Sequence, residues 1–456
     1  MTLSRLLAVM AVAGLLQPTS AQGPSLSTRD VLALATESPA AFERTWEARV
    51  EAAGTDASGE ARAERRAARA RGYIDYTYFR WRETGETTPA AWPARRRAVA
   101  AVDVNDATAL DRREHHAFLD AWLRAEARAR LASDASLATG DNRWLRARFA
   151  VVEAQVREPL VRRRLLRDAL TQHIDENGAR GVPELIDRYA ALTGASRDDV
   201  DRLRRAAAEA LAPAAGDRVE IYKKAGGVAL EAHVFAPAGT AGARPGLLWF
   251  HGGSWASGAW SHCPTVCRAA RDAGYVVIQI EYRTDDRFAS GPLAAIADAR
   301  DALAWARTRA ADLGVDPARL MVAGFSSGGT IAALLATTSP AAHLRGGILM
   351  SACLAPSHDG WFLRMTEGRI PQRDITPAAQ IDAADPAMLA VHGDADEMCP
   401  YADTAAFVDA ARAAQAAGTG SELLTLPGAT HFFPFRSPDA RTRAAQAVTQ
   451  FLERRR

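Results

Sequence analysis

Cysteine is scarce in this sequence, and its scarcity limits the kinds of site and scaffold that the chain can form. Four of the 456 residues are cysteine, at positions 263, 267, 353 and 399. They lack the spacing of a zinc site and are too few for a disulfide-stapled fold. An oxidising compartment would permit one bridge, but Cys263 and Cys267 are a poor pair if both lie on one helix. We therefore expect mostly free, packed thiols.

The sequence also lacks an excess of charge of one sign and, after its first residues, a long hydrophobic run. Lysine and arginine total 56 against 54 acidic residues, so the formal net charge of +2 provides no global field for nucleic acid. No later stretch is long enough for a membrane helix, and we expect no stable membrane insertion. The hydrophobic content of 48% is that of an ordinary globular protein, and a chain of 456 residues predicts more than one domain.

The first residues have the pattern of an export signal. Arg5 precedes an apolar run over residues 6–16, which is followed by Pro18 and by small residues up to Ala21. This order of charge, apolar core and small residues predicts cleavage after Ala21. The run is shorter than the ~20 residues that span a bilayer. We expect residues 1–21 to be a signal peptide and the protein to be exported, periplasmic or secreted; the alternative is a buried N-terminal helix.

The rest of the chain has two halves with different patterns. Over residues 26–212 apolar side chains recur every three or four positions with charges between them, which predicts helices throughout. The stretch "PAAGD" at 213–217 is typical of a linker. We expect a separate all-α domain of unknown function over residues 26–212 and a catalytic domain over residues 218–456.

The second half alternates strands and helices. Residues 219–239 have the polar–apolar alternation of a hairpin. Nearly continuous apolar runs, as expected of strands buried on both faces, then lie at 246–250, 275–282, 319–325, 346–352, 387–393 and 421–428. Because helical segments lie between most of these runs, the fold class is α/β with a doubly wound, mostly parallel sheet. Active sites of such sheets gather at the carboxyl ends of the strands.

Two adjacent serines follow one of these strands. The stretch "GFSSGG" places Gly324 and Gly328 around Ser326 and Ser327, between an apolar run and a helical segment. A sharp strand-to-helix turn needs such small neighbours, because the backbone of the nucleophile is held in an unfavourable conformation. On this frame Ser326 is the candidate nucleophile, and Ser327 contributes its backbone N–H. Alone, the pattern also fits a glycine-rich turn without chemistry.

The stretch "FHGGSW" follows the first long strand. An oxyanion hole needs backbone N–H groups that point into a cavity, which residues without bulky side chains allow. We expect the N–H groups of Gly253 and Ser254, together with that of Ser327, to form the hole; the alternative is a β-turn without a catalytic duty. Trp255 is expected to serve packing.

Two polar loops follow later strands. In "HGDADEMCP" and "GATHFF" they carry Asp396 and His431. The order serine, acid, histidine is the one that this sheet architecture requires. A serine hydroxyl needs a base to remove its proton, histidine titrates near neutrality, and the acid fixes the imidazole tautomer. Asp394 is the rival acid, although its place near the turn favours a loop-capping role.

Other histidines have simpler explanations. His251 and His392 lie in "HG" turns and are expected to hold loops by hydrogen bonds. His115 and His116 lack the H-E-x-x-H spacing of a zinc site, and we expect them to be surface or core residues.

Residues from about 218 to 456 resemble the α/β-hydrolase superfamily, and most closely its hormone-sensitive-lipase-like branch of carboxylesterases. The matching stretches are "HGGSW", "IEYR", "GVDPARLMVAGFSSGG", "HGDADEMCP" and "GATHFF". The resemblance implies a catalytic triad of Ser326, Asp396 and His431. The sequence departs from the family pattern at Ser254, which replaces a glycine, at "GFSSGG" in place of GDSAGG, and at "TDDRFASGP" in place of a proline-rich stretch that helps to shape the substrate pocket.

These features predict an exported serine carboxylesterase that acts on short-acyl or acetyl esters through an acyl-enzyme, without a metal or organic cofactor. Its substrate would be a small-molecule or polysaccharide-linked ester. One alternative is a peptidase of the same superfamily. Another, of a different class, is an interaction or scaffold protein that works through its helical half. The sequence specifies neither the ester nor the oligomeric state.

Overall fold

The structure of this chain is a computed structural model. It describes residues 26–456 apart from 55–57, 87, 89–91, 138–139, 193, 212–217, 238–241, 264, 340–342, 357–361, 363–365, 367–371 and 416–419. The predicted signal peptide and the predicted linker at 213–217 lie outside the described residues and stay predictions.

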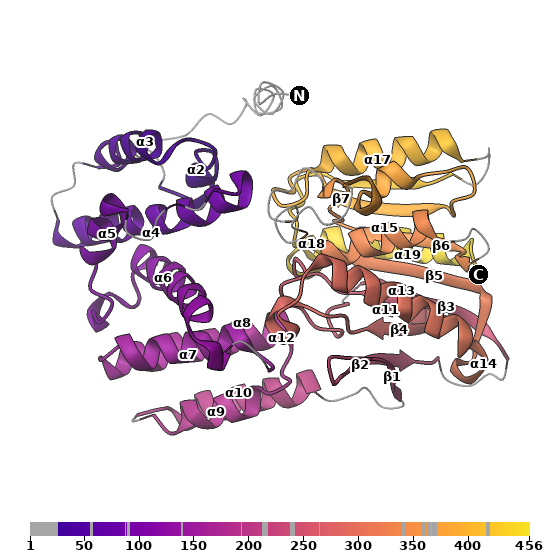
Figure 1. Cartoon of the computed structure of the whole chain (residues 1–456), viewed down its shortest axis with the longest axis horizontal. Coiled ribbons are helices and arrows are strands. Elements are labelled where there is room, and N and C mark those ends of the chain that lie inside the picture. The colour runs from indigo at the N-terminus through magenta and orange to yellow at the C-terminus, as the bar shows by residue number, and fades with distance from the viewer. Residues whose placement is uncertain are drawn as a thin grey trace. The chain divides into compact units, whose positions relative to one another are not determined.

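The chain forms two compact units, and the division falls within a helix. The first unit comprises Met1–Asp103 and Thr108–Ala121, and the second comprises Val104–Ala107 and Trp122–Arg456. The boundary therefore lies inside helix α6 (Arg113–Ser133), well before the end of the helical half. Helices α7 to α10 group with the sheet (Figure 1). The domain limits expected from the sequence, 26–212 and 218–456, do not coincide with this division.

The first unit is built from helices around an aromatic cluster. Its other helices are α2 (Thr28–Leu32), α3 (Pro39–Ala52), α4 (Gly59–Thr84) and α5 (Pro93–Ala100). The division between the units also falls within a 3-10 turn over Ala107–Ala109. The hydroxyls of Ser38 and Ser58 cap the N-termini of α3 and α4. The rings of Phe42 and Tyr76 stack at 3.9 Å. A Cβ at Gly72 would lie 2.2 Å from the indole of Trp46, so glycine permits α3 and α4 to approach here.

Four further helices precede the sheet within the second unit. They are α7 (Arg143–Gln155), α8 (Pro159–Asn177), α9 (Val182–Ala190) and α10 (Arg197–Leu211), after a 3-10 turn over Ala135–Leu137. Proline stands in the first turn of α8 and α9. N–H groups in a first turn have no partner within the helix, so proline costs no hydrogen bond there. The predicted helical character of this part is confirmed.

The rest of the second unit is an eight-stranded sheet in the order β1-β2-β4-β3-β5-β6-β7-β8. Its strands are β1 (Arg218–Ala225), β2 (Val228–Phe235), β3 (Arg244–Phe250), β4 (Val276–Ile280), β5 (Val315–Phe325), β6 (Gly346–Met350), β7 (Met388–Gly393) and β8 (Glu422–Leu426). The hairpin β1–β2 is antiparallel and joins β4 antiparallel, whereas β4, β3 and all later strands run parallel. The hairpin and all six predicted strands are confirmed.

Helices cover both faces of the sheet. One core cluster joins alternate strand residues such as Leu248 and Phe250 to α13 (Pro292–Thr308), α15 (Ser327–Thr338) and α17 (Tyr401–Ala414). The other joins Leu247 and Trp249 to α11 (Val266–Asp272) and α19 (Pro438–Glu453). This two-sided burial is why the strands are almost wholly apolar. Short helices α12 (Asp285–Phe288), α14 (Ala310–Leu313) and α18 (Phe433–Arg436) and 3-10 turns over Gln372–Ile375 and Pro377–Gln380 complete the unit.

The expectation of free thiols is wrong. Cys263 pairs with Cys267 and Cys353 with Cys399, with Cα–Cα distances of 5.6 and 4.8 Å. The first pair is possible because Cys263 lies in the loop before α11 and not on the helix. The second joins the loops that follow the neighbouring strands β6 and β7, which the sequence could not place side by side.

None of the described helices combines the length and the apolar character that crossing a membrane requires.

Candidate active site

Ser326 lies at the turn between β5 and α15, in a strained backbone conformation. Its φ is 55° and its ψ is −122°, a backbone conformation that residues other than glycine rarely adopt. The glycines beside it are sterically required: a Cβ at Gly324 would lie 2.1 Å from the carbonyl oxygen of Gly328, and one at Gly328 would lie 2.1 Å from that of Phe250. The Ser326 N–H donates to the carbonyl of Met350 at 3.0 Å. The predicted sharp strand-to-helix turn is therefore present.

The three predicted triad residues meet at the carboxyl edge of the sheet. His431 Nε2 lies 3.0 Å from Ser326 Oγ, and His431 Nδ1 lies 2.8 Å from Asp396 Oδ2. All three residues are buried. Because Asp396 is an acceptor, it fixes the proton of His431 on Nδ1 and leaves Nε2 free to accept the serine proton. The geometry is that of a serine nucleophile with its base and orienting acid.

Asp396 is held as a carboxylate by its hydrogen bonds. Burial alone would raise the pKa of Asp396, but bonds from His392 and His431 and from the Cys399 N–H outweigh burial and hold that pKa below its usual range. Its Oδ1 accepts the N–H groups of Met398 and Cys399, both at 2.9 Å. The side chain therefore stays ionised across the neutral range, as an orienting acid requires.

His392 contributes to this site in a way that sequence reasoning missed. Its Nε2 lies 2.9 Å from the Cys399 carbonyl and 3.1 Å from Asp396 Oδ2, and its Nδ1 lies 2.9 Å from Thr404 Oγ1. His392 holds the loop that carries Asp396, as expected, and it also contacts the Asp396 carboxylate itself. The local "HG" signal marked a structural histidine but could not indicate which residues its ring would face.

Asp394 and Ser351 fix the loop that carries the base. Asp394 Oδ1 accepts the N–H of Gly428 at 2.6 Å, which is the loop-capping role expected for it. The Ser351 hydroxyl donates to the carbonyl of His431 at 3.2 Å. The structure therefore places Asp394 outside the triad.

The predicted oxyanion loop adjoins the serine turn. It follows β3, which pairs with β5 so that Phe250 lies opposite Gly324. A Cβ at Gly328 would also lie 2.3 Å from the carbonyl of His251, so the loop and the turn are in contact. Gly253, Ser254 and Trp255 all have positive φ, at 125°, 55° and 56°.

The predicted oxyanion-hole N–H groups of Gly253 and Ser254 lie in a sharp backbone turn. The Gly253 carbonyl accepts the N–H groups of Ala256 and Ser257 at 3.0 and 3.1 Å. Ser327 is the first residue of α15, where helical geometry gives the N–H no partner within the helix. Two further sequence expectations hold. His251 bonds the carbonyl of Gly252 at 2.8 Å, and Trp255 is buried against Phe362.

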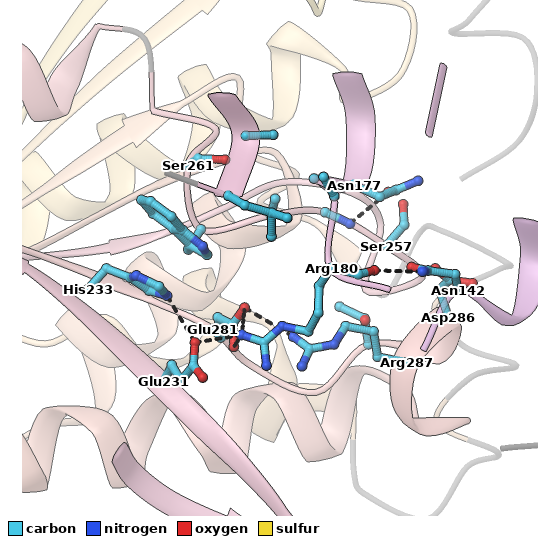
Figure 2. Close-up of a pocket in the computed structure, with 18 of the residues that line it drawn as sticks. Asn142, Asn177, Arg180, Glu231, His233, Ser257, Ser261, Glu281, Asp286 and Arg287 are labelled. Carbon is cyan, nitrogen blue, oxygen red and sulfur yellow. Dashed lines mark hydrogen bonds and ion pairs between the residues drawn. The ribbon is translucent and has the colours of Figure 1, made fainter. Parts of the chain in front are cut away.

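A second polar group lies at the other end of the oxyanion loop. Glu231, His233 and Glu281 are the one set among the described residues whose side chains lie close enough to share a metal ion. They line a cavity of ≈ 400 Å³ together with Asn142, Asn177, Ser257 and Trp260 (Figure 2). Arg180 Nη2 lies 2.5 Å from Glu231 and 3.3 Å from Glu281, and Arg287 Nη1 lies 3.1 Å from Glu281. These arginines already balance the carboxylates, and we assign the set to an ion-pair network.

Part of this chain is similar to known proteins. The BD-FAE family model matches residues 233–352. The chain is 37% identical over 95 residues to the carboxylesterase NlhH of Mycobacterium tuberculosis, which covers 20% of this chain and 28% of that protein. It is 29% identical over 215 residues to an ethyl acetate hydrolase of Pseudomonas putida, covering 41% of this chain and 65% of the relative. The chain thus spans less than two thirds of the length of these relatives.

Among solved structures, the native Est2 esterase of Thermogutta terrifontis is similar at 29% identity and a TM-score of 0.48, over 52% of this chain and 92% of that chain. Motifs, sheet topology and sequence relatives agree. Residues 218–456 are thus similar, in motifs, sheet topology and sequence relatives, to the hormone-sensitive-lipase-like branch of carboxylesterases in the α/β-hydrolase superfamily.

Proposed function

We propose that this protein is a serine carboxylesterase that hydrolyses short-acyl or acetyl esters through an acyl-enzyme. The observation that carries the proposal is the continuous hydrogen-bonded chain from Ser326 Oγ through His431 to Asp396. The name of one relative, ethyl acetate hydrolase, supports a short acyl group. The substrate would be a small ester or an acetyl ester carried on a polysaccharide.

The reaction follows from the geometry in two half-reactions. His431 Nε2 takes the proton of Ser326 Oγ as this oxygen bonds to the ester carbonyl carbon. The carbonyl oxygen becomes an oxyanion, which the N–H groups of Gly253, Ser254 and Ser327 stabilise. The carbon–oxygen bond to the alcohol then breaks, and the alcohol leaves with the proton from His431.

Water completes the cycle. It attacks the acyl carbon and gives a proton to His431, and Ser326 leaves with that proton as the acid is released. Asp396 stabilises the imidazolium that forms twice in the cycle. Nucleophile, base and oxyanion donors are all side chains or backbone of this chain, so the proposed reaction requires no metal or organic cofactor.

Export is part of the proposal. The N-terminal pattern of charge, apolar core and small residues supports it. Two disulfides in one chain are typical of proteins that fold in an oxidising compartment and support it independently. Cell fractionation of the expressed full chain tests export, and a protein retained in the cytosol at full length would contradict it.

A substrate panel separates the esterase from the alternatives. We expect release of p-nitrophenol from p-nitrophenyl acetate, faster than from long-chain esters, and no release of p-nitroaniline from aminoacyl anilides. Turnover of anilides but not esters would favour a peptidase of the same superfamily. Ser326→Ala should abolish ester turnover, and ester turnover that survives this substitution would contradict the mechanism. A folded wild-type protein that acts on neither panel would favour the scaffold hypothesis.

A further inference from the structure

The oxyanion loop is bonded to helices of the preceding segment as well as to the sheet. The loop comprises residues 251–258, and it ends at Gly258. The Gly258 N–H donates to Asn177 Oδ1, at the last residue of α8, at 3.0 Å. Asn177 lies 81 residues earlier in the chain. A helix that is not part of the sheet therefore fixes the end of the loop.

Asn177 is itself held by a buried relay of polar side chains. Its Nδ2 lies 3.2 Å from His173 Nδ1, His173 Nε2 lies 2.9 Å from Asn142 Oδ1, and Asn142 Nδ2 donates to the Arg180 carbonyl at 2.6 Å. Burial lowers the pKa of His173 to about 3, so this ring stays neutral and has one donor and one acceptor nitrogen. Each of these three hydrogen bonds then pairs a donor with an acceptor. The Asn177 oxygen is left to accept from the loop (Figure 2).

A second route joins the loop to the start of α7. The N–H groups of Asp285 and Asp286 donate to the carbonyls of Trp255 and Ala256 at 3.0 and 2.8 Å. The carboxylates of the same two residues accept from Trp144, Asp285 Oδ2 from the indole N–H at 2.9 Å and Asp286 Oδ1 from the backbone N–H at 2.7 Å. Helix α12 thus lies between the loop and α7, with hydrogen bonds on both sides.

The loop needs such support because its backbone is strained. Ser254 and Trp255 both have φ near 55°, a conformation that costs on the order of 1 kcal/mol or more per residue and persists only where the surroundings impose it. Most alternatives that relieve this strain would turn the Gly253 and Ser254 N–H groups away from the oxyanion. A relaxed loop would therefore lower the rate of the chemical step before it altered substrate binding.

We propose that helices α7 and α8 position the oxyanion loop, with Asn177 and Trp144 as the positioning residues. The proposal rests on the proposed esterase function and assigns a role to a helical segment whose function the sequence pattern does not indicate. Neither residue touches the substrate. Each acts through the loop, so that their removal should affect kcat and leave KM nearly unchanged.

Asn177→Ala in the full chain tests this role, with Asn105→Ala as its matched control. Asn105 Oδ1 also accepts backbone N–H groups, from Arg157 and Glu158 at the other end of α8, at 2.6 and 3.0 Å. We expect Asn177→Ala to lower kcat on p-nitrophenyl acetate at least about tenfold, with KM within about twofold of wild type. Affinity for a trifluoromethyl ketone, which mimics the oxyanion, should fall in parallel. Asn177→Asp keeps the acceptor oxygen for Gly258 but sets a second oxygen against the acceptor His173 Nδ1, so it should recover kcat only in part.

Two results would overturn the proposal. One is a kcat for folded Asn177→Ala equal to that of Asn105→Ala. The other is a loss of activity that only follows the unfolded fraction in thermal melts. If Asn177→Ala does not fold, Trp144→Phe, which removes the indole N–H that Asp285 accepts and keeps an aromatic ring, must show the same fall in kcat at constant KM. Ester turnover that survives Ser326→Ala would instead refute the proposed function, so the two failures are distinguishable.

Discussion

At the serine turn, the space available to each residue limits which amino acid can stand there. Ser326 faces His431 with a backbone of positive φ, and neither flanking glycine can carry a side chain: one on Gly324 would meet Gly328 within the turn, and one on Gly328 would meet Phe250 of the neighbouring strand. Both glycines were predicted, because small neighbours are the local sign of such a turn. The strand that contacts them could not be predicted, since β3 lies far away in sequence and meets β5 only through the sheet register.

Replacing Gly328 therefore provides a direct test of this packing. The new Cβ of Gly328→Ala would lie 2.1 and 2.3 Å from the carbonyl oxygens of Phe250 and His251, which are backbone atoms and cannot move aside alone. We expect a loss of at least about 2 kcal/mol in the free energy of unfolding, measured by urea denaturation. Gly420→Ala is the control, since nothing lies within 4 Å of a Cβ there. Equal stability of the two variants would contradict the close approach.

Asp286 makes stability depend on pH in a specific direction. Burial raises the pKa of this carboxyl to about 6, above the ordinary value of 3.8 that applies to the unfolded chain. The folded state then binds the proton more tightly, so the contribution of Asp286 is greatest below about pH 4, declines as pH rises to 6 and is constant above. Two pKa units correspond to about 3 kcal/mol.

Urea unfolding of wild type and Asp286→Asn at pH 4 and pH 7 measures this contribution. The free energy of unfolding of wild type should fall relative to that of the variant by about 2 kcal/mol between the two pH values. Comparison with the variant cancels the titration of other groups. The same difference at both pH values would mean that Asp286 titrates normally.

At the scale of elements, the strands were predictable and their side-by-side neighbours were not. Runs such as 319–325 are apolar because both faces of the sheet are covered, and that signal is local. Cysteine pairing is not local. Cys353 and Cys399 meet because β6 and β7 are neighbours, and an expectation built on sequence spacing considered only Cys263 and Cys267. The contacts of Asn177 and His392 were missed for the same reason.

The two disulfides should stabilise the fold by different amounts. Cys353 and Cys399 are 46 residues apart and Cys263 and Cys267 only four. The loop-closure entropy of the unfolded chain gives about 4 kcal/mol for the longer loop and about 2 for the shorter. Urea denaturation of the double variants Cys353→Ala/Cys399→Ala and Cys263→Ala/Cys267→Ala should reproduce this order. A larger loss from the short pair would show that local strain or packing decides, and not loop closure.

At the scale of the whole molecule, the compact unit that contains the sheet begins well before the predicted linker. Helices α7 to α10 group with the sheet, and ion pairs such as Arg180–Glu281 join them to it. The spacing of apolar residues changes from a helical to a strand-like pattern near residue 213, which marks where the strands begin. It could not indicate that the preceding helical segment bonds to residues beside the sheet, such as Gly258 and Glu281, because no local pattern marks the distant partner of a polar side chain.

Two shortened chains test this grouping. A chain of residues 104–456 keeps every contact of the second unit, whereas one of residues 217–456 loses Asn177, Trp144 and Arg180 and leaves Glu281 without one of its arginines. We expect the longer chain to remain folded and to hydrolyse p-nitrophenyl acetate, and the shorter one to be unstable or inactive, as judged by thermal melts and turnover. Full activity of residues 217–456 would show that the catalytic part needs no helices before the sheet.

Ser326 is the proposed nucleophile, and mapping of a covalent label on the full chain tests this assignment. The full chain would be treated with a fluorophosphonate, digested and analysed by tandem mass spectrometry, beside Ser326→Ala and Ser327→Ala. Ser326 meets the base at 3.0 Å, and Ser327 is assigned only its backbone N–H. We predict one adduct on Ser326, no labelling of Ser326→Ala, and near wild-type labelling of Ser327→Ala. An adduct on Ser327, or labelling that persists in Ser326→Ala, would contradict the account.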